Sequence, residues 1–207
     1  MGSGSRDVGH IIEAASAGLL QAYLDEPEAW YAHNFRYLAA VMHRLLTNTP
    51  LDKSRAELEA LQRVTSTFVG AINTSFVEFF PALERLPRVL QLWRSSWEKV
   101  GTFHHDVFKA WWATMAPVTD PGAGSSFVRD VILSRYSGGD ERAAYLTMMS
   151  MSAGADNPRM TMNAWVMACL VHPAAMQRAR DEIERVCGTD ADRLPTLYLP
   201  RWNRVPY

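Results

Sequence analysis

Cysteine is scarce in this chain: its 207 residues include only Cys169 and Cys187. Two cysteines do not make a disulfide framework, and neither one lies in a Cys-x-x-Cys or Cys/His spacing that holds a metal. No run reaches about 18 consecutive apolar residues, so the sequence predicts no membrane span. The first residues also lack the basic and then apolar order of a signal peptide. These absences predict a chain in a reducing compartment, in the cytoplasm by default.

An excess of charge of one sign is absent as well. The 21 Lys and Arg residues nearly balance the 22 Asp and Glu residues, and the formal net charge is −1. Such a balance gives no electrostatic reason to expect nucleic acid or an acidic membrane surface as a partner. The alternation of apolar and polar residues that is typical of strands is missing too, and so are internal repeats.

What the sequence does contain is helical periodicity. Apolar residues recur at spacings of three and four almost throughout, which predicts an all-α chain. A stripe that includes Trp93, Trp97 and Trp111 is expected to bury several indoles, and the proline-rich stretch 79–87 and the Gly/Ser-rich stretch 117–126 are expected to be loops. The expected helices cover residues 8–23, 31–45, 54–71, 90–115, 127–136, 141–171 and 177–186.

The helix expected over 141–171 carries the unusual chemistry. It is apolar on nearly all sides, as in the middle of a large protein, yet it contains Ala153-Gly154-Ala155-Asp156-Asn157-Pro158. Pro158 has no N–H, so the carbonyl of Gly154 loses its helical donor. These residues predict a kink near Asn157 and Pro158, with a gap that holds water or a small polar ligand. A kink with a purely structural, satisfied Asp156 remains the alternative.

Further motifs follow this stretch in order: His172-Pro173, Asp181-Glu182-Ile183, Val186-Cys187-Gly188 and Arg193-Leu194-Pro195. The succession resembles the central part of the cytochrome P-450 (haem-thiolate monooxygenase) family, particularly its fungal microsomal members. The segment from Phe79 to Pro87 and the Trp-rich helix after it look like the region between two helices over the substrate pocket. The resemblance implies an incomplete cytochrome P-450 fold, with residues 1–207 as a single partial domain.

In that family, Ala153 and Gly154 would lie against the haem face, where larger side chains collide with the porphyrin. Asp156 would belong to the proton relay for oxygen activation. Asn157 stands where the family usually has a threonine, and an amide cannot pass a proton as a hydroxyl does. The family's haem-ligating cysteine loop and Glu-x-x-Arg pair are not found in this sequence, nor are its N-terminal anchor and sheet region. Neither Cys169 nor Cys187 is expected to bind the haem iron.

The resemblance implies a fragment of a monooxygenase that is inactive alone. A full-length relative would use haem, dioxygen and an NADPH-dependent flavoprotein reductase to hydroxylate an apolar small molecule, at the endoplasmic reticulum membrane and in fungal secondary metabolism. The alternative is a non-catalytic helical protein that binds an apolar ligand or a partner protein. No metal site is expected at His104 and His105, because adjacent helical residues point to different faces.

Overall fold

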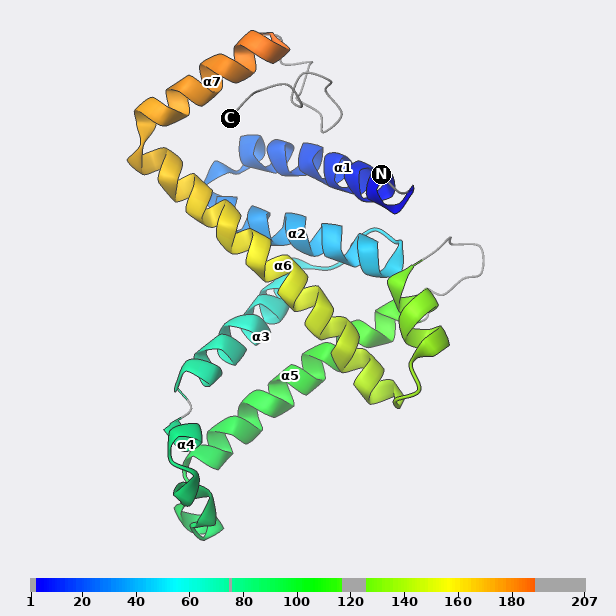
Figure 1. The fold of residues 1–207 in the computed structure, drawn as a ribbon, viewed down its shortest axis with the longest axis vertical. Helices are drawn as coiled ribbons and strands as arrows, with labels where there is room; N and C mark the ends of the chain where they lie inside the picture. The colour runs from blue at the N-terminus through cyan, green and yellow to red at the C-terminus, as the bar shows by residue number, and fades with distance from the viewer. Residues whose placement is uncertain (1–2, 75, 117–125, 189–207) are drawn as a thin grey trace. The chain divides into compact units, whose positions relative to one another are not determined.

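The computed structural model describes residues 3–74, 76–116 and 126–188 (Figure 1). Within these ranges the chain forms helices and their connections, and no strand occurs. The predicted all-α class is therefore confirmed for the described residues. Most of the loop expected over 117–126 and the Arg193-Leu194-Pro195 motif lie outside them. None of the described helices is long and apolar enough to cross a membrane.

Seven helices in the described ranges are α-helical, and all the predicted helices have a counterpart. The proline-rich stretch forms two short 3-10 turns, Pro81–Arg85 and Arg88–Leu90, because its prolines prevent a continuous helix. The short helix predicted over 127–136 is a π-helical segment, Val128–Leu133. The α-helices are α1 (Ser3–Asp25), α2 (Trp30–Thr47), α3 (Arg55–Thr74), the single-turn α4 (Phe76–Phe79), α5 (Trp93–Met115), α6 (Asp140–Val171) and α7 (Pro173–Cys187).

Local residues explain where α3 begins and where α7 ends. At the start of α3, Ser54 and Glu57 bond reciprocally: the Ser54 N–H donates to Glu57 Oε2 (2.9 Å), and the Glu57 N–H donates to Ser54 Oγ (3.3 Å). Hydrogen bonds that Lys53, the Ser54 N–H and the Ser54 hydroxyl donate to the Glu57 carboxylate lower its pKa to about 2. Gly188 ends α7 at a φ of 86°, which favours glycine, and its N–H donates to Glu184 O.

The chain divides into two compact units, one of residues 1–37 with 158–207 and one of residues 38–157. In the first unit, the interior is held by polar side chains. Tyr23 donates to Asn34 Oδ1, and Asn34 Nδ2 donates to Asn163 Oδ1 at 2.8 Å. Nearby, the buried Arg159 donates to the hydroxyl of Tyr31 at 2.6 Å. This unit therefore depends on buried hydrogen bonds as well as on apolar contact.

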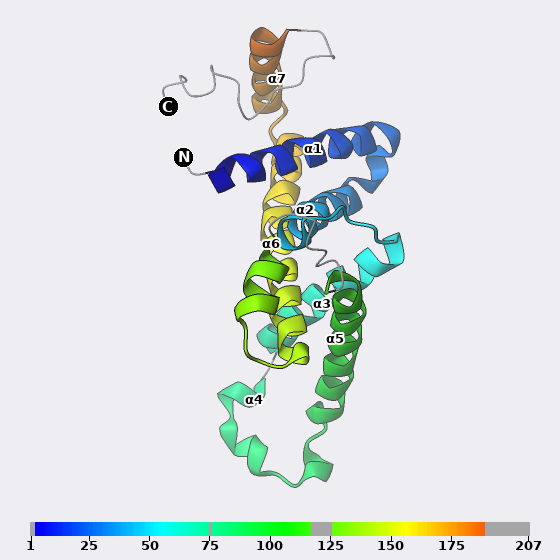
Figure 2. The same ribbon diagram turned by 90° about the vertical axis from the view of Figure 1, so that its right-hand side faces the viewer.

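The second unit has an apolar core. Helix α3 packs against α5, and α6 contributes the buried Met148 and Met151. Figure 2 shows α3 and α5 beside the first half of α6, as Figure 1 does. The side chains that are under 2% exposed include Trp111, Leu61, Met115, Ile132, Met148, Met151 and Val128. Methionine suits such a core because its unbranched chain fills irregular gaps.

One expectation about burial was wrong. Trp111 is buried as predicted, but Trp97 is 39% exposed, and the buried indole next to Trp111 is Trp112, which lies off the predicted stripe. The reason is that α5 is contacted on two sides in its second half: Lys53 lies over the Trp111 ring, and the Trp112 N–H donates to the Asp140 carboxylate of α6 at 2.8 Å.

Helix α6 also differs from the expectation of neighbours on all sides. Between residues 143 and 155 it is largely buried, with Ala155 fully so. Beyond Pro158, Trp165 is 60% exposed and Leu170 77% exposed. Helix α6 continues through Pro158 as one helix. The kink near Asn157 stays a prediction.

Candidate functional site

A pocket of about 180 Å³ lies within the second unit, between α3, α5 and the middle of α6. Its walls are mainly apolar, with Phe68 and Val69 from α3, Phe108 from α5 and Met149 from α6. The remaining lining residues are Val64, Thr65, His104, Ser152, Ala153, Asp156 and Asn157. Such a concave apolar surface with a few convergent polar groups is typical of a small-molecule site.

Three of the four residues singled out on α6 meet in this pocket. Ala153, Asp156 and Asn157 are three and four positions apart, so the helix places them on one face. The Asn157 amide donates through Nδ2 to the carbonyl of Ala153 at 3.0 Å, which orients its side chain along the helix. Asp156 is half-buried, and Ala153 is exposed. The helix thus presents a small side chain next to a carboxylate and an amide.

Gly154, the fourth residue, does not line the pocket. Its Cα faces Met42 of α2, and a Cβ built there would lie 2.6 Å from Met42 Sδ and closer still to its methyl group. Glycine allows this approach of Met42, and a larger residue would require the flexible end of the Met42 side chain to move. Sequence reasoning did not anticipate Met42, because nothing in the spacing of α2 indicates which methionine would meet the glycine.

The contact between Gly154 and Met42 leads to a stability prediction. A Cβ added at Gly101, on α5, would meet no atom within 4 Å. Gly101→Ala should therefore stabilise the fold by about 1 kcal/mol through helix propensity. Gly154→Leu should destabilise it by about 1–3 kcal/mol, because Met42 must move. Denaturant unfolding measures both. Met42→Ala should recover part of the Gly154→Leu loss in a double-mutant cycle, and additivity of the two changes would contradict the contact.

The α5 wall of the pocket is titratable. His104 Nε2 shares a hydrogen bond of 2.7 Å with Thr67 Oγ1, and its ring stacks at 6.4 Å on Phe108. Burial lowers the pKa of His104 below the usual value of an imidazole. The pocket also has two buried hydroxyls, Thr65 Oγ1 and Ser152 Oγ, that have no hydrogen-bond partner among the described residues. Sequence reasoning missed these α3 and α5 residues because their neighbours come from distant parts of the chain.

The histidines predict how stability responds to pH. Burial lowers the pKa of His104, and burial is also the largest cause of the lowered pKa of His43. Both imidazoles therefore resist protonation in the folded chain. The unfolded chain takes up protons near pH 6.5, so it gains protons that the folded chain does not. The free energy of unfolding should therefore fall as pH drops from 7.5 to 5.5. Urea titrations at several pH values measure it.

The control for this prediction replaces both histidines. In the double variant with His43→Gln and His104→Gln, the free energy of unfolding should vary less with pH across the same interval than it does in the unmodified chain. An unfolding free energy that rises on acidification in the unmodified chain would contradict the prediction, since it would require groups whose pKa is raised by folding.

Metal ligands do not gather in the described part of the chain, where no group of three or more His, Cys, Asp or Glu residues lies close enough to hold an ion. His104 lines the same pocket as Asp156, whereas His105 lies on a different face of α5, beside Tyr145. Both imidazoles are half-buried. Cys169 is half-buried and Cys187 is buried, and both are free thiols.

Comparison with known proteins gives the family that the chain is similar to. A cytochrome P450 monooxygenase of Armillaria gallica is 27% identical over 210 residues, which cover 96% of this chain and 39% of the relative. Cytochrome P450 monooxygenase 231 of Postia placenta is 25% identical over 202 residues, which cover 81% of this chain and 35% of the relative. The chain resembles fungal cytochrome P450 monooxygenases.

This resemblance covers most of the chain but only a part of each P450 relative. The chain spans between 35% and 39% of the length of these two relatives. No family model matches the chain, and no solved structure matches it. An all-helical chain that aligns with part of a cytochrome P450 agrees with the predicted partial, all-α fold.

Proposed function

We propose that the chain is the central part of a cytochrome P450 monooxygenase and that the α3/α5/α6 pocket takes its apolar substrate. One observation carries this proposal: three residues from the stretch of α6 that carries the resemblance, Ala153, Asp156 and Asn157, line a mainly apolar pocket together with Phe68 and Phe108. A mainly apolar wall suits an apolar small molecule, which loses contact with water when it enters. In this proposal residues 1–207 form one partial domain.

The residues of α6 have different roles in the proposal. The half-buried Asp156 holds and passes a proton at its carboxylate, next to the bound substrate. Asn157 orients water or substrate by hydrogen bonding, because its amide does not titrate. Ala153 and Gly154 keep that part of the helix free of large side chains. Asp156 and Asn157 support this assignment by lining the same pocket.

Haem would supply the oxygen chemistry when bound, but the described residues do not fit a haem-thiolate site. Cys187, at the end of α7, is only 6% exposed, and Cys169 is half-buried within α6. The Gly154 Cα, expected to face the porphyrin, is covered by Met42. We therefore assign the haem ligand to the rest of the full-length protein, the part that aligns with the remaining length of the relatives.

The partners of the full-length protein follow from the same proposal. They are an NADPH-dependent flavoprotein reductase and an apolar small molecule, with a location at the endoplasmic reticulum membrane and a role in fungal secondary metabolism. Sequencing the complete transcript tests the proposal. The expected result is an open reading frame that continues beyond Tyr207 into a Glu-x-x-Arg pair and a cysteine-containing loop. Genomic and transcript sequences that both close the frame after Tyr207 would count against it.

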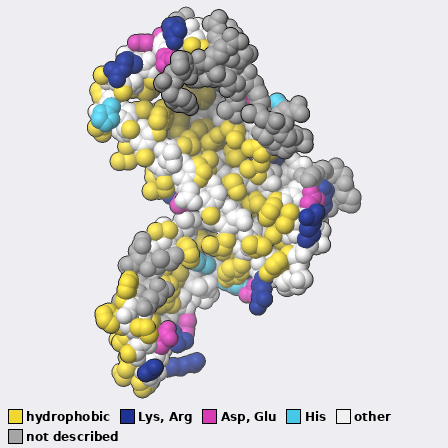
Figure 3. All heavy atoms as spheres, viewed as in Figure 1, with side chains coloured by type: hydrophobic (Ala, Val, Ile, Leu, Met, Phe, Trp, Pro, Cys, Tyr) yellow, Lys and Arg dark blue, Asp and Glu magenta, His cyan; other side chains and the backbone are white. Residues whose placement is uncertain are grey.

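The second candidate function is a non-catalytic helical protein that binds an apolar ligand or a partner protein. It is favoured by the exposed apolar side chains of α6 beyond Pro158, where Val171 is 71% exposed and Trp165 60% exposed. Hydrophobic side chains also cover much of the face seen in Figure 3, where charged side chains form only small groups. A purified chain that binds an apolar ligand tightly and shows no haem absorption would favour this function.

A further inference from the structure

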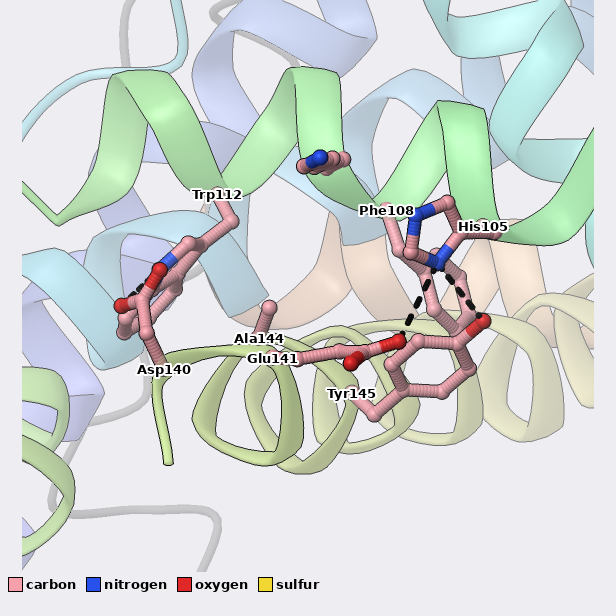
Figure 4. Close-up of a pocket in the computed structure, with 8 residues that line it drawn as sticks. His105, Phe108, Trp112, Asp140, Glu141, Ala144 and Tyr145 are labelled. Carbon is pink, nitrogen blue, oxygen red and sulfur yellow. Dashed lines mark hydrogen bonds and ion pairs between the residues drawn. The ribbon is translucent and has the colours of Figure 1, made fainter. Parts of the chain in front are cut away.

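A second cavity, of about 350 Å³, lies between the C-terminal half of α5 and the first two turns of α6 (Figure 4). Helix α5 contributes His105, Phe108 and Trp112, which its periodicity places on one face. Helix α6 contributes Asp140, Glu141 and Tyr145. The volume falls within the range of small-molecule sites. None of the residues proposed to act in the monooxygenase reaction lines this cavity.

The floor of the cavity is aromatic and fixed in place. Phe108 and Tyr145 meet edge to face, with ring centroids 5.2 Å apart and planes at 79°. Trp112 is held by its N–H, which donates to Asp140 Oδ1 at 2.8 Å. Phe108 is 2% exposed and also lines the candidate substrate pocket, so the two pockets share one wall.

The rim of the cavity is negative. Figure 4 shows the Glu141 carboxylate between the Trp112–Asp140 pair and the His105–Tyr145 pair. The Glu141 side chain is 73% exposed, and Oε1 lies 3.5 Å from His105 Nδ1. The lining includes two carboxylates and one lysine, Lys109, so acidic side chains outnumber the lysine. Burial, followed by Glu141 and Asp106, raises the pKa of Tyr145 above its usual value, which fits negative surroundings.

We propose that this cavity binds a small organic cation with an apolar body, such as an aryl-substituted quaternary ammonium ion. The half-buried Tyr145 ring, which the buried Phe108 and Trp112 support, attracts a cation through its electron-rich face, and Glu141 supplies the opposite charge at the rim. An anion would meet two carboxylates, and a neutral apolar molecule would desolvate them without compensation. The site goes beyond the proposed monooxygenase function and does not depend on it.

The position of His105 makes the binding dependent on pH. A protonated His105 would pair with Glu141 at 3.5 Å and repel the bound cation. The other charged or titratable groups at the site are Asp140 and Tyr145 on α6 and Asp106 and Lys109 on α5. Binding of the cation should therefore weaken when the imidazole at this position gains a proton.

The first test uses the unmodified chain and three probes of similar shape. Benzyltrimethylammonium, benzyl alcohol and benzoate are titrated into the chain, and binding is followed by calorimetry and by nuclear Overhauser contacts to the aromatic side chains. The expected order is cation, then alcohol, with no binding of benzoate. The contacts should include the Tyr145 and Trp112 rings. Equal binding of benzyl alcohol and the cation, or contacts confined to Phe68 and Met149, would overturn the proposal.

The second test changes the exposed Glu141 and the half-buried Tyr145. Glu141→Gln should weaken binding of benzyltrimethylammonium about fivefold, as expected for an exposed ion pair. Tyr145→Leu should weaken it about threefold through loss of a ring, whereas Tyr145→Phe should leave it unchanged. The matched control is Glu98→Gln, the same change on α5 away from the cavity. Equal weakening in Glu98→Gln would show an effect of net charge alone and overturn the proposal.

Discussion

Expressed by itself, the chain is expected to give no thiolate-type absorption band after reduction and addition of carbon monoxide. That band requires a cysteine thiolate on the haem iron. The buried Cys187 lies at the end of α7, and Cys169 lies within α6, so neither thiol stands in a loop open to a haem. Packing cannot replace a missing thiolate, so the expected loss is complete and not partial. Difference spectra of the purified, haem-reconstituted chain measure it.

A full-length fungal relative, expressed and reconstituted in parallel, is the positive control for this spectrum. A strong thiolate-type band from the chain alone would contradict the prediction. Cys169→Ser and Cys187→Ser would then identify the ligand, because only one of the two variants should lose the band. A weak band at a shorter wavelength in both variants would indicate histidine or non-specific ligation, which the prediction allows.

The positions of the helices were predictable from the sequence because they depend on local spacing. The stripes over 31–45 and 141–171 correspond to α2 and α6 with small shifts at their ends. The glycine that ends α7 was also predictable, since a φ of 86° at Gly188 is a local backbone requirement. These features need no information from distant residues.

Burial and partners were less predictable because they depend on residues far apart in the chain. Trp97 and Trp111 belong to one stripe, yet only Trp111 is buried, since α3 and the Lys53 side chain lie near the second half of α5. Gly154 was expected to lie against the haem face, and among the described residues its neighbour is the Met42 side chain. A sequence shows that a glycine leaves room and does not show what occupies it.

The α3/α5/α6 pocket shows the same contrast between features set by local spacing and features set by distant residues. Ala153, Asp156 and Asn157 share a face by spacing alone, and the structure confirms that they line one pocket. The α3 residues opposite, such as Phe68, come from a helix some 85 positions earlier, and no local pattern pairs them with α6. The site residues on one helix were therefore within reach of sequence reasoning, and the opposite wall was not.

The role of Asp156 has a large expected effect that can be measured once haem is present. The chain is joined to the N- and C-terminal parts of a full-length fungal relative, so that the chimera has the full length of the relative. The chimera is expected to bind haem, and Asp156→Ala should leave the haem content unchanged, because the carboxylate lines the candidate substrate pocket and does not fill the core. Haem content is measured in every variant before its activity is compared.

In that chimera, Asp156→Ala should slow product formation by about 10²–10⁴-fold, the range typical of a lost general acid or base. The half-buried carboxylate lies beside the substrate pocket, where alanine cannot hold a proton. Asn157→Thr, which places a hydroxyl at the neighbouring position, should preserve or raise the product formed per NADPH consumed. Asp156→Asn separates the two explanations, because an amide keeps the hydrogen bonds of a structural partner but cannot titrate. If Asp156→Ala and Asp156→Asn both keep the rate and the coupling, the carboxylate is a structural partner of the helix at Pro158 and has no part in proton delivery.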